Sequence, residues 1–258
     1  MIAAPIAHRG LHLADGPPEN SFAAADAAVE RGYAIECDVQ LSGDGVPVVF
    51  HDETVDRMTS QSGAVRDFTA AELGRMALNA TEETVPTLAR FLDHVGRRAP
   101  LFVELKRQDK RVLGRPPHHG RNRMLAAAVS RVIENFVGDA ALMSFDPRLV
   151  VFARRTMPNR PRGIVAMGAA SDNEGHVPGW QHFGGSHLFH LPWSRPHFIA
   201  YEAAALPAFA PVTAAKLLDL PLLCWTVRDQ AEADRVSSTD QIIFEDFIPR
   251  RTEGSPKA

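Results

Sequence analysis

Cysteine is scarce in this sequence, and its scarcity excludes several classes of protein. The 258 residues include two cysteines, Cys37 and Cys224, which form no disulfide framework and lack the paired spacing of a metal site. Each lies in an apolar, strand-like run, on the side opposite its polar neighbours. We therefore expect both to be reduced and buried, with no part in thiol catalysis.

Strong charge and long apolar runs are also missing. The net charge is -3 and the pI is about 6.4, so no global field attracts nucleic acid or a membrane surface. No apolar run reaches the roughly 20 residues of a membrane-spanning helix, and no basic, apolar leader is apparent. These features predict a cytoplasmic protein without a nucleic-acid partner or stable membrane insertion. They leave the oligomeric state open.

The chain does contain a regular alternation of apolar strands and helical segments. With 258 residues and 45% hydrophobic content it can build one large core. Most of the expected strands are apolar throughout, as when both faces are buried. They cover residues 5–8, 34–39, 100–106, 140–144, 163–165, 198–202, 221–227 and 241–244. Helices are expected at 21–31, 86–96, 124–136, 147–156, 211–218 and 230–236, with one loose helix within 168–190. We predict an α/β fold, a (β/α)8 TIM barrel.

A ninth apolar run, residues 46–50, follows the turn Ser42-Gly43-Asp44-Gly45. We expect it to pair with 34–39 as a hairpin, which would bring His51 back beside Glu36. Residues 52–85, irregular with one short helix, are predicted to form a small insertion after the second strand unit. The expected domain is residues 1–250, and the tail 251–258, without apolar anchors, is expected to be disordered.

Acidic side chains gather at the ends of the predicted strands. Glu36 and Asp38 share one face of a strand, and Glu104 and Lys106 repeat this spacing on another. Buried carboxylates this close repel each other unless a cation or hydrogen-bond donors lie between them. The alternative to such a site is that these acids lie exposed on the surface at a strand end. If the two strands are barrel neighbours, three carboxylates converge, and such oxygen ligands suit Mg2+ or Ca2+.

Cationic side chains and histidines accompany these acids. Arg9 and Lys106 beside a metal would suit an anion, most naturally a phosphate. His8 and His51 can exchange protons near neutral pH, as the breaking of a phosphodiester requires. Either histidine alone would be interpreted as structural, but the combination favours an active site at the carboxyl ends of the strands.

These residues resemble the glycerophosphodiester phosphodiesterase family, whose signature is an HR pair, a spaced ExD and then an H. The blocks that carry the resemblance are His8-Arg9-Gly10, Pro18-Glu19-Asn20-Ser21, Glu36-Cys37-Asp38-Val39, Asp44-Gly45 and His51-Asp52. Later blocks of the family correspond to Arg57-Met58-Thr59, Val85-Pro86-Thr87-Leu88, Glu104-Leu105-Lys106, Ser144-Phe145 and Cys224-Trp225-Thr226-Val227.

The resemblance implies hydrolysis of glycerophosphodiesters, with a divalent cation, to glycerol 3-phosphate and an alcohol. By that similarity the metal ligands would be Glu36, Asp38 and Glu104, and the acid/base pair would be His8 and His51. The substrate-binding residues would be Arg9, Glu19, Asn20, Lys106 and Trp225. The family picture allows a cyclic phosphate formed by the adjacent glycerol hydroxyl; the residues do not separate that route from direct attack by water.

Several acids and basic residues receive no role from the sequence. The last strand departs from the family pattern of a small residue or Thr before Asp and Pro, so Glu245 and Asp246 are left unassigned. Glu202 could touch substrate or pair with a loop. The basic loop 107–123 is either a solvated loop or an electropositive rim for an anionic substrate. The remaining histidines, His118, His119, His187 and His190, show no ligand spacing.

Two alternatives to the leading interpretation are left open. The first is a related phosphodiesterase that acts on a lysophospholipid or another sugar phosphodiester, with the cyclising route as one option. Apolar residues near the barrel mouth would favour a lipid, and the candidates are Phe145, Phe183, Phe189, Trp193 and Phe198. A non-catalytic binder of glycerophosphodiesters is the other alternative, although it would be expected to lack one of the catalytic groups.

Overall fold

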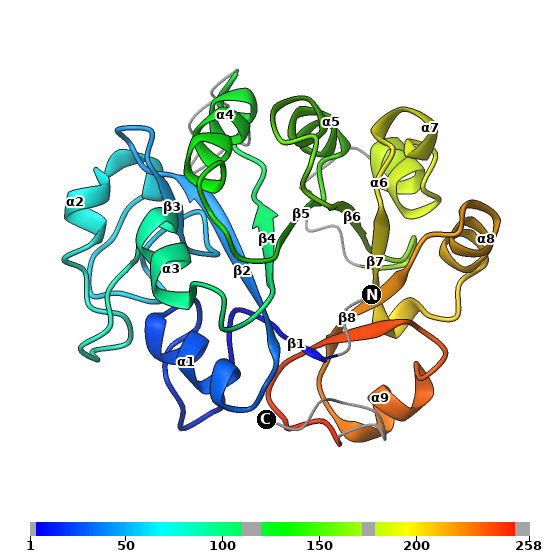
Figure 1. The fold of residues 1–258 in the computed structure, drawn as a ribbon, viewed down its shortest axis with the longest axis horizontal. Helices are drawn as coiled ribbons and strands as arrows, with labels where there is room; N and C mark the ends of the chain where they lie inside the picture. Colours follow the sequence, from blue (N-terminus) through cyan, green and yellow to red (C-terminus); the bar gives the residue numbers. More distant parts are fainter. Residues whose placement is uncertain (1–3, 110–119, 172–178, 251–258) are drawn as a thin grey trace.

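Eight parallel strands form a closed barrel in the computed structural model, which describes residues 4–109, 120–171 and 179–250. The order around the described barrel is β1-β9-β8-β7-β6-β5-β4-β2, and β1 pairs with β2 to close it. Helices surround the strands (Figure 1), so the predicted (β/α)8 TIM barrel is confirmed. The barrel strands are β1 (Ile6–Ala7), β2 (Ala34–Leu41), β4 (Leu101–Leu105), β5 (Ala140–Ser144), β6 (Arg162–Ala166), β7 (Phe198–Glu202), β8 (Leu222–Val227) and β9 (Gln241–Phe244).

Capping side chains determine where several helices begin. The Ser21 hydroxyl accepts the Ala24 N–H at the start of the first helix, and Asp146 accepts the Arg148 N–H before Pro147 opens another. The helices are α1 (Phe22–Glu30), α2 (Ala70–Leu73), α3 (Leu88–Val95), α4 (Arg121–Ile133), α5 (Pro147–Thr156), α6 (Gly179–Ser186), α7 (Leu191–Ser194), α8 (Phe209–Leu218) and α9 (Gln230–Arg235), with short 3-10 turns η1 (Val65–Asp67) and η2 (Ala203–Ala205).

The structure differs from the expected helices at the start of α4 and in one additional short helix. Helix α4 begins at Arg121, three residues before the predicted start, because Asn122 is tied to two neighbouring loops. Its amide donates to Asp146 (3.0 Å) and its carbonyl accepts the Gln108 N–H (2.7 Å). The loose helix expected within 168–190 corresponds to α6, and the short α7 at Leu191–Ser194 is an additional helix that was not predicted.

Apolar side chains separate into a layer inside the barrel and a layer beneath the helices. The alternation along β2 turns Ile35 and Cys37 outward to the helices, while Ala34 faces the barrel interior. Both cysteines are buried and unpaired. Phe198 packs edge-to-face on Phe102 inside the barrel, with ring centroids 5.7 Å apart. The expectation that Phe198 lines the mouth is therefore wrong, because it belongs to the inward face at the start of β7.

The segment between β2 and α3 forms a separate small layer on one side of the barrel (Figure 1). Strand β3 (Pro47–Val49) runs antiparallel to β2, with Val39 opposite Val49, as the predicted hairpin requires. The residues after it carry η1 and α2 around their own apolar cluster, which is Val48, Phe50, Val55, Met58, Val65, Leu73, Met76, Leu78 and Val85. This cluster gives the excursion a core independent of the barrel.

The helices of the described residues are too short or too polar to cross a bilayer.

Candidate active site

Three buried carboxylates meet where β2 and β4 run side by side. Asp38 pairs in register with Glu104, and Glu36 lies two residues earlier on the same face of β2. One carboxylate oxygen of each residue lies within 4.8 Å of those of the other two. The three residues are almost fully buried, at 1%, 1% and 7% exposure for Glu36, Asp38 and Glu104. The strand register thus brings the predicted metal ligands together.

Of the three carboxylates, Glu36 is the one whose ionised form is most disfavoured by the grouping. Burial, together with the neighbouring charges of Asp38 and Glu104, raises the pKa of Glu36 well above its usual value. One of its oxygens, Oε1, is buried and has no hydrogen-bond partner. Burial also opposes ionisation of Asp38, but the charges of Lys106, His51 and Arg9 outweigh it and lower its pKa. Ionisation of Glu36 is therefore the least favourable in the cluster without a further cation.

Two cationic side chains lie against these carboxylates. The Lys106 ammonium is 3.0 Å from Glu104 Oε1 and 3.3 Å from Asp38 Oδ1. The Arg9 guanidinium reaches Asp38 Oδ2 at 3.2 Å and Glu19 Oε1 at 2.9 Å. Arg9 has a left-handed backbone (φ 54°), and its N–H donates to Glu36 Oε2 at 2.9 Å. Both predicted phosphate-binding cations are thus adjacent to the predicted metal ligands.

Asn20 and Glu19 hold this arrangement in place. The Asn20 amide donates to Asp38 Oδ2 (3.0 Å), and its carbonyl accepts the Asp38 N–H (3.2 Å). Its own N–H donates to the Arg9 carbonyl oxygen at 2.8 Å, which joins the loop after β1 to β2. Glu19 accepts from Arg9 and from Arg57. The turn Pro18-Glu19-Asn20-Ser21 therefore orients Asp38 and Arg9.

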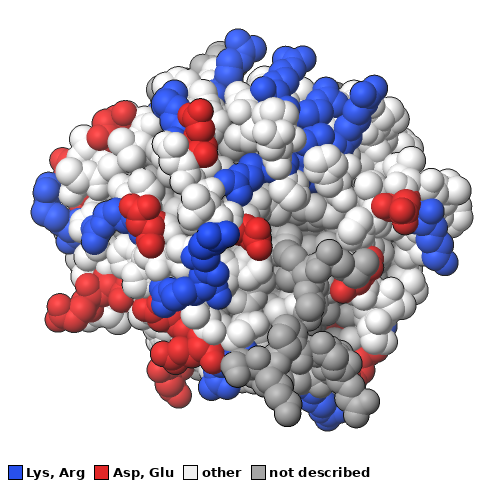
Figure 2. All heavy atoms as spheres, in the orientation of Figure 1, with Lys and Arg blue, Asp and Glu red and all other residues white. Residues whose placement is uncertain are grey.

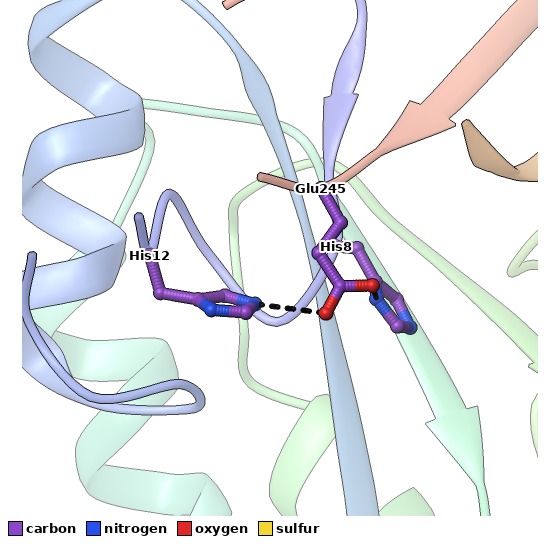
Figure 3. Close-up of side chains that lie close together, drawn as sticks. All are labelled: His8, His12 and Glu245. Carbon is purple, nitrogen blue, oxygen red and sulfur yellow. Dashed lines mark hydrogen bonds and ion pairs between the residues drawn. The ribbon is translucent and has the colours of Figure 1, made fainter. Parts of the chain in front are cut away.

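His8 lies directly after β1, between two carboxylates. Its Nδ1 is 3.1 Å from Glu245 Oε2, and its Nε2 is 3.9 Å from Glu36 Oε2. Burial lowers the pKa of His8, and the hydrogen bond to Glu245 only partly offsets that effect. Figure 3 shows the Glu245 carboxylate between the His8 and His12 rings. Sequence reasoning left Glu245 unassigned, and no motif signalled its pairing with His8.

His51 belongs to a chain of charged side chains across the mouth. Its Nδ1 is 2.7 Å from Asp52 Oδ1, and Arg57 Nε donates to Asp52 Oδ2 at 2.6 Å. Arg57 also donates to both oxygens of Glu19, at 2.9 and 2.7 Å. The hairpin places Phe50 opposite Asp38, with the Phe50 N–H donating to the Asp38 carbonyl at 2.9 Å. Because Phe50 lies opposite Asp38, the register puts the next residue, His51, at the level of Cys37. It was expected beside Glu36, one residue earlier in β2.

Trp225 and Glu202 occupy neighbouring strand positions near the mouth. They pair in register across β7 and β8. The Trp225 ring packs edge-to-face on Phe145 with centroids 5.1 Å apart, and its Nε1–H points to the carbonyl oxygens of Ala166 and Ala200 (3.3 Å each). Glu202 accepts the Gly168 N–H at 2.7 Å and the Ser171 hydroxyl. Glu202 is thus a partner of the loop after β6.

The described part of the basic loop is largely engaged with other protein groups. Arg107 pairs with Asp109 at 2.7 Å, and Arg121 donates to the carbonyl oxygens of Leu41 and Ser42 at 3.0 Å each. Figure 2 shows Lys and Arg side chains gathered over α4 and α5, with the two signs interspersed elsewhere on that face. Residues 110–119 of this loop, including His118 and His119, lie outside the described residues.

The sequence motifs do not predict the partners that orient the two predicted catalytic histidines. These are Glu245 for His8, and Asp52 with Arg57 for His51. Asp52 and Arg57 were visible in the motifs His51-Asp52 and Arg57-Met58-Thr59, but their contact depends on the path of the insertion. His187 follows α6 and bonds back to the Phe183 carbonyl, and His190, which precedes α7, bonds to the Ser194 hydroxyl.

Comparison with known proteins finds relatives over most of the chain. The model of the glycerophosphoryl diester phosphodiesterase family matches residues 8–243. The glycerophosphodiester phosphodiesterase of Caldanaerobacter subterraneus is 43% identical over 109 residues, which are 39% of this chain and 44% of that protein. Glycerophosphodiester phosphodiesterase 1 of Bos taurus is 37% identical over 217 residues, 76% of this chain and 56% of that protein. The chain thus spans about half the length of these curated relatives.

Solved structures share the fold. A phosphodiesterase of Oleispira antarctica, solved in complex with the product sn-glycerol-3-phosphate, superposes with a TM-score of 0.75. It is 24% identical, and the match covers 94% of this chain and 92% of that one.

Proposed function

This chain belongs to the glycerophosphoryl diester phosphodiesterase family, and on that premise we propose that it hydrolyses glycerophosphodiesters to glycerol 3-phosphate and an alcohol. One observation carries the proposal: the three buried carboxylates lie beside the His8 ring and two cationic side chains, and His51 directly follows Phe50, whose N–H donates to the Asp38 carbonyl. Structural ion-pair networks seldom bury three carboxylates with an oxygen left unpartnered, whereas active sites do so where a ligand completes them.

The carboxylate cluster fits a divalent cation. Glu36, Asp38 and Glu104 would hold it, and the unpartnered Glu36 Oε1 is the oxygen that such an ion would satisfy. The donors are all oxygen, which suits a hard ion, Mg2+ or Ca2+. When bound, the cation supplies positive charge that polarises the phosphoryl oxygens and stabilises the charge that develops on them.

The protein's own groups provide the proton transfers. His8 presents Nε2 toward Glu36, and the Nδ1 contact with Asp52 leaves Nε2 of His51 available. One histidine removes a proton from the attacking hydroxyl, and the other protonates the leaving alkoxide oxygen, so the P–O bond breaks without releasing a free alkoxide. Lys106 and Arg9 add positive charge beside the same carboxylates and orient the phosphate by hydrogen bonds.

Two routes use the same groups. In one, water attacks phosphorus; in the other, the adjacent glycerol hydroxyl attacks first, and water then opens the cyclic phosphate. The products at early times distinguish the two, because a cyclic phosphate forms on the second route alone.

The decisive experiment follows substrate and products by phosphorus NMR. Glycerophosphocholine and a lysophospholipid are each incubated with the protein and Mg2+ or Ca2+. We expect glycerol 3-phosphate from glycerophosphocholine. If only the lipid is hydrolysed, the proposed substrate is wrong. If glycerophosphocholine binds without being hydrolysed, the protein is a binding protein and not an enzyme. The lipid alternative is supported by Phe145, which is 38% exposed beside Trp225.

A further inference from the structure

Glu245 is fixed at the point where the barrel closes. It is the first residue after β9, and its N–H donates to the Val227 carbonyl at the end of β8 (3.0 Å). The His8 N–H donates to the Phe244 carbonyl (2.9 Å), so the backbones that carry Glu245 and His8 are joined directly. Three adjacent strand ends, β8, β9 and β1, therefore determine the relative position of these two side chains.

The Glu245 carboxylate is surrounded by donors. Oε2 lies 3.1 Å from His8 Nδ1 and 3.4 Å from an Arg228 amino group, and Oε1 lies 3.8 Å from His12 Nε2. Figure 3 shows one oxygen directed to each imidazole ring. These three groups leave the carboxylate little freedom to turn away from His8.

The carboxylate is ionised at neutral pH. Burial opposes ionisation, but the hydrogen bond and charge of His8, with the charges of Arg9 and His12, lower the pKa of Glu245 to about 2. An ionised carboxylate can accept hydrogen bonds and cannot donate them. The proton in the 3.1 Å contact must therefore belong to His8 Nδ1.

We propose that Glu245 is a positioning residue that holds His8 in the tautomer with Nδ1 protonated. In a neutral ring of this tautomer, Nε2 carries the lone pair. That nitrogen lies 3.9 Å from Glu36 Oε2, on the side of the carboxylate cluster. Glu245 thereby directs the proton-accepting atom of His8 toward the reaction centre. This inference rests on the proposed function, because it assigns His8 a proton transfer in that reaction.

A metal site at the same group of side chains is less favourable. His8, His12 and Glu245 bring ligand atoms within 4.8 Å of one another, as a two-histidine, one-carboxylate site would. However, the Arg228 guanidinium already lies at the oxygen that faces His8, and a divalent ion there would meet its positive charge. The Glu245 carboxylate is better matched to hydrogen-bond donors than to a second cation.

The test compares Glu245→Gln and Glu245→Asp with the wild type. The amide can donate to Nδ1 and stabilise the other tautomer, so we expect kcat to fall by about 10- to 1000-fold with KM changed less than about threefold. Glu245→Asp, which keeps the charge, should recover part of kcat. Glu202→Gln is the matched control: it removes another carboxylate, at the end of β7, which accepts hydrogen bonds from the loop after β6, and we expect it to change kcat little.

The tautomer itself is measured by two-bond proton–nitrogen correlation NMR of the imidazoles, with His8→Gln to assign the His8 signals. We expect protonated Nδ1 in the wild type and in Glu245→Asp, and a shift toward protonated Nε2 in Glu245→Gln. An unchanged kcat, or a His8 tautomer that Glu245→Gln does not alter, would overturn the proposal. The NMR readout needs no substrate. A wild type that failed to hydrolyse glycerophosphodiesters would therefore refute the proposed reaction and leave the tautomer assignment separately testable.

Discussion

Asp38 and Glu104 are direct register partners across β2 and β4, and the Lys106 ammonium bridges their side chains. Parallel pairing puts both carboxylates at one height in the barrel, and Glu36 lies on the same face of its strand. The carboxylate cluster is therefore a consequence of strand register.

Replacing Glu36 should have opposite effects on stability and on metal binding. With a chelator present, Glu36→Gln should raise the free energy of unfolding near pH 8. This carboxyl has a raised pKa, and each pKa unit costs the ionised folded state about 1.4 kcal/mol. With Mg2+ or Ca2+ present, the order should reverse, because the variant binds the cation more weakly. Thermal unfolding in both conditions and titration calorimetry measure the two effects.

A lower free energy of unfolding for Glu36→Gln than for the wild type in the chelator would contradict the claim that the ionised Glu36 destabilises the folded protein. Wild-type activity that survived exhaustive chelation would contradict the role of the cation.

Removing His51 should abolish most turnover. His51→Ala should lower kcat by a factor on the order of 100 to 10000, the usual contribution of a general acid or base. The control is His94→Ala on α3, where the histidine pairs with Asp26 at 3.0 Å in the same type of contact, away from the mouth. Steady-state assays should show near-normal kcat for the control; near-normal kcat for His51→Ala would remove His51 from the mechanism.

Arg57 should be required for its shape as well as its charge. It donates to Glu19 and Asp52 through separate nitrogens, which a single ammonium cannot reproduce. Arg57→Lys should therefore loosen Asp52 and His51 and lower kcat by roughly 3- to 30-fold.

The matched control is Arg98→Lys, since Arg98 pairs with Asp26 on the surface at 2.9 Å. Equal kcat in Arg57→Lys and the wild type would show that the contact chain does not support His51.

Acid should destabilise the protein partly through Glu245. Its pKa is lowered from 4.5 to about 2 in the folded protein, so its contribution to stability is complete above pH 4.5 and disappears as pH falls toward 2. Denaturant unfolding across this range should show a shallower loss of stability in Glu245→Gln than in the wild type. Parallel curves for the two proteins would mean that the carboxylate gains nothing from His8.

Much of the site follows from the sequence because strand alternation and turn formation depend on residues close together in the chain. The alternation along 34–39 was enough to put Glu36 and Asp38 on one face and Cys37 on the other, and the turn at Gly43-Asp44 predicted the hairpin. The motifs from His8-Arg9-Gly10 to His51-Asp52 indicated the family.

The start of α4 and the position of Phe198 were not predictable in the same way, because long-range contacts decide them. The hydrogen bond from Asn122 to Asp146 fixes the start of α4, and packing on Phe102 places Phe198 inside the barrel.

The sequence by itself determined the barrel, the carboxylates and the two histidines. The tertiary structure alone decided which groups orient them. His8 and Glu245 are 237 positions apart and meet because β9 closes on β1. Arg57 reaches Glu19, 38 positions away, because the insertion packs against the turn that carries Glu19. A carboxylate's partner depends on which strand ends are adjacent in space, and barrel closure sets that adjacency.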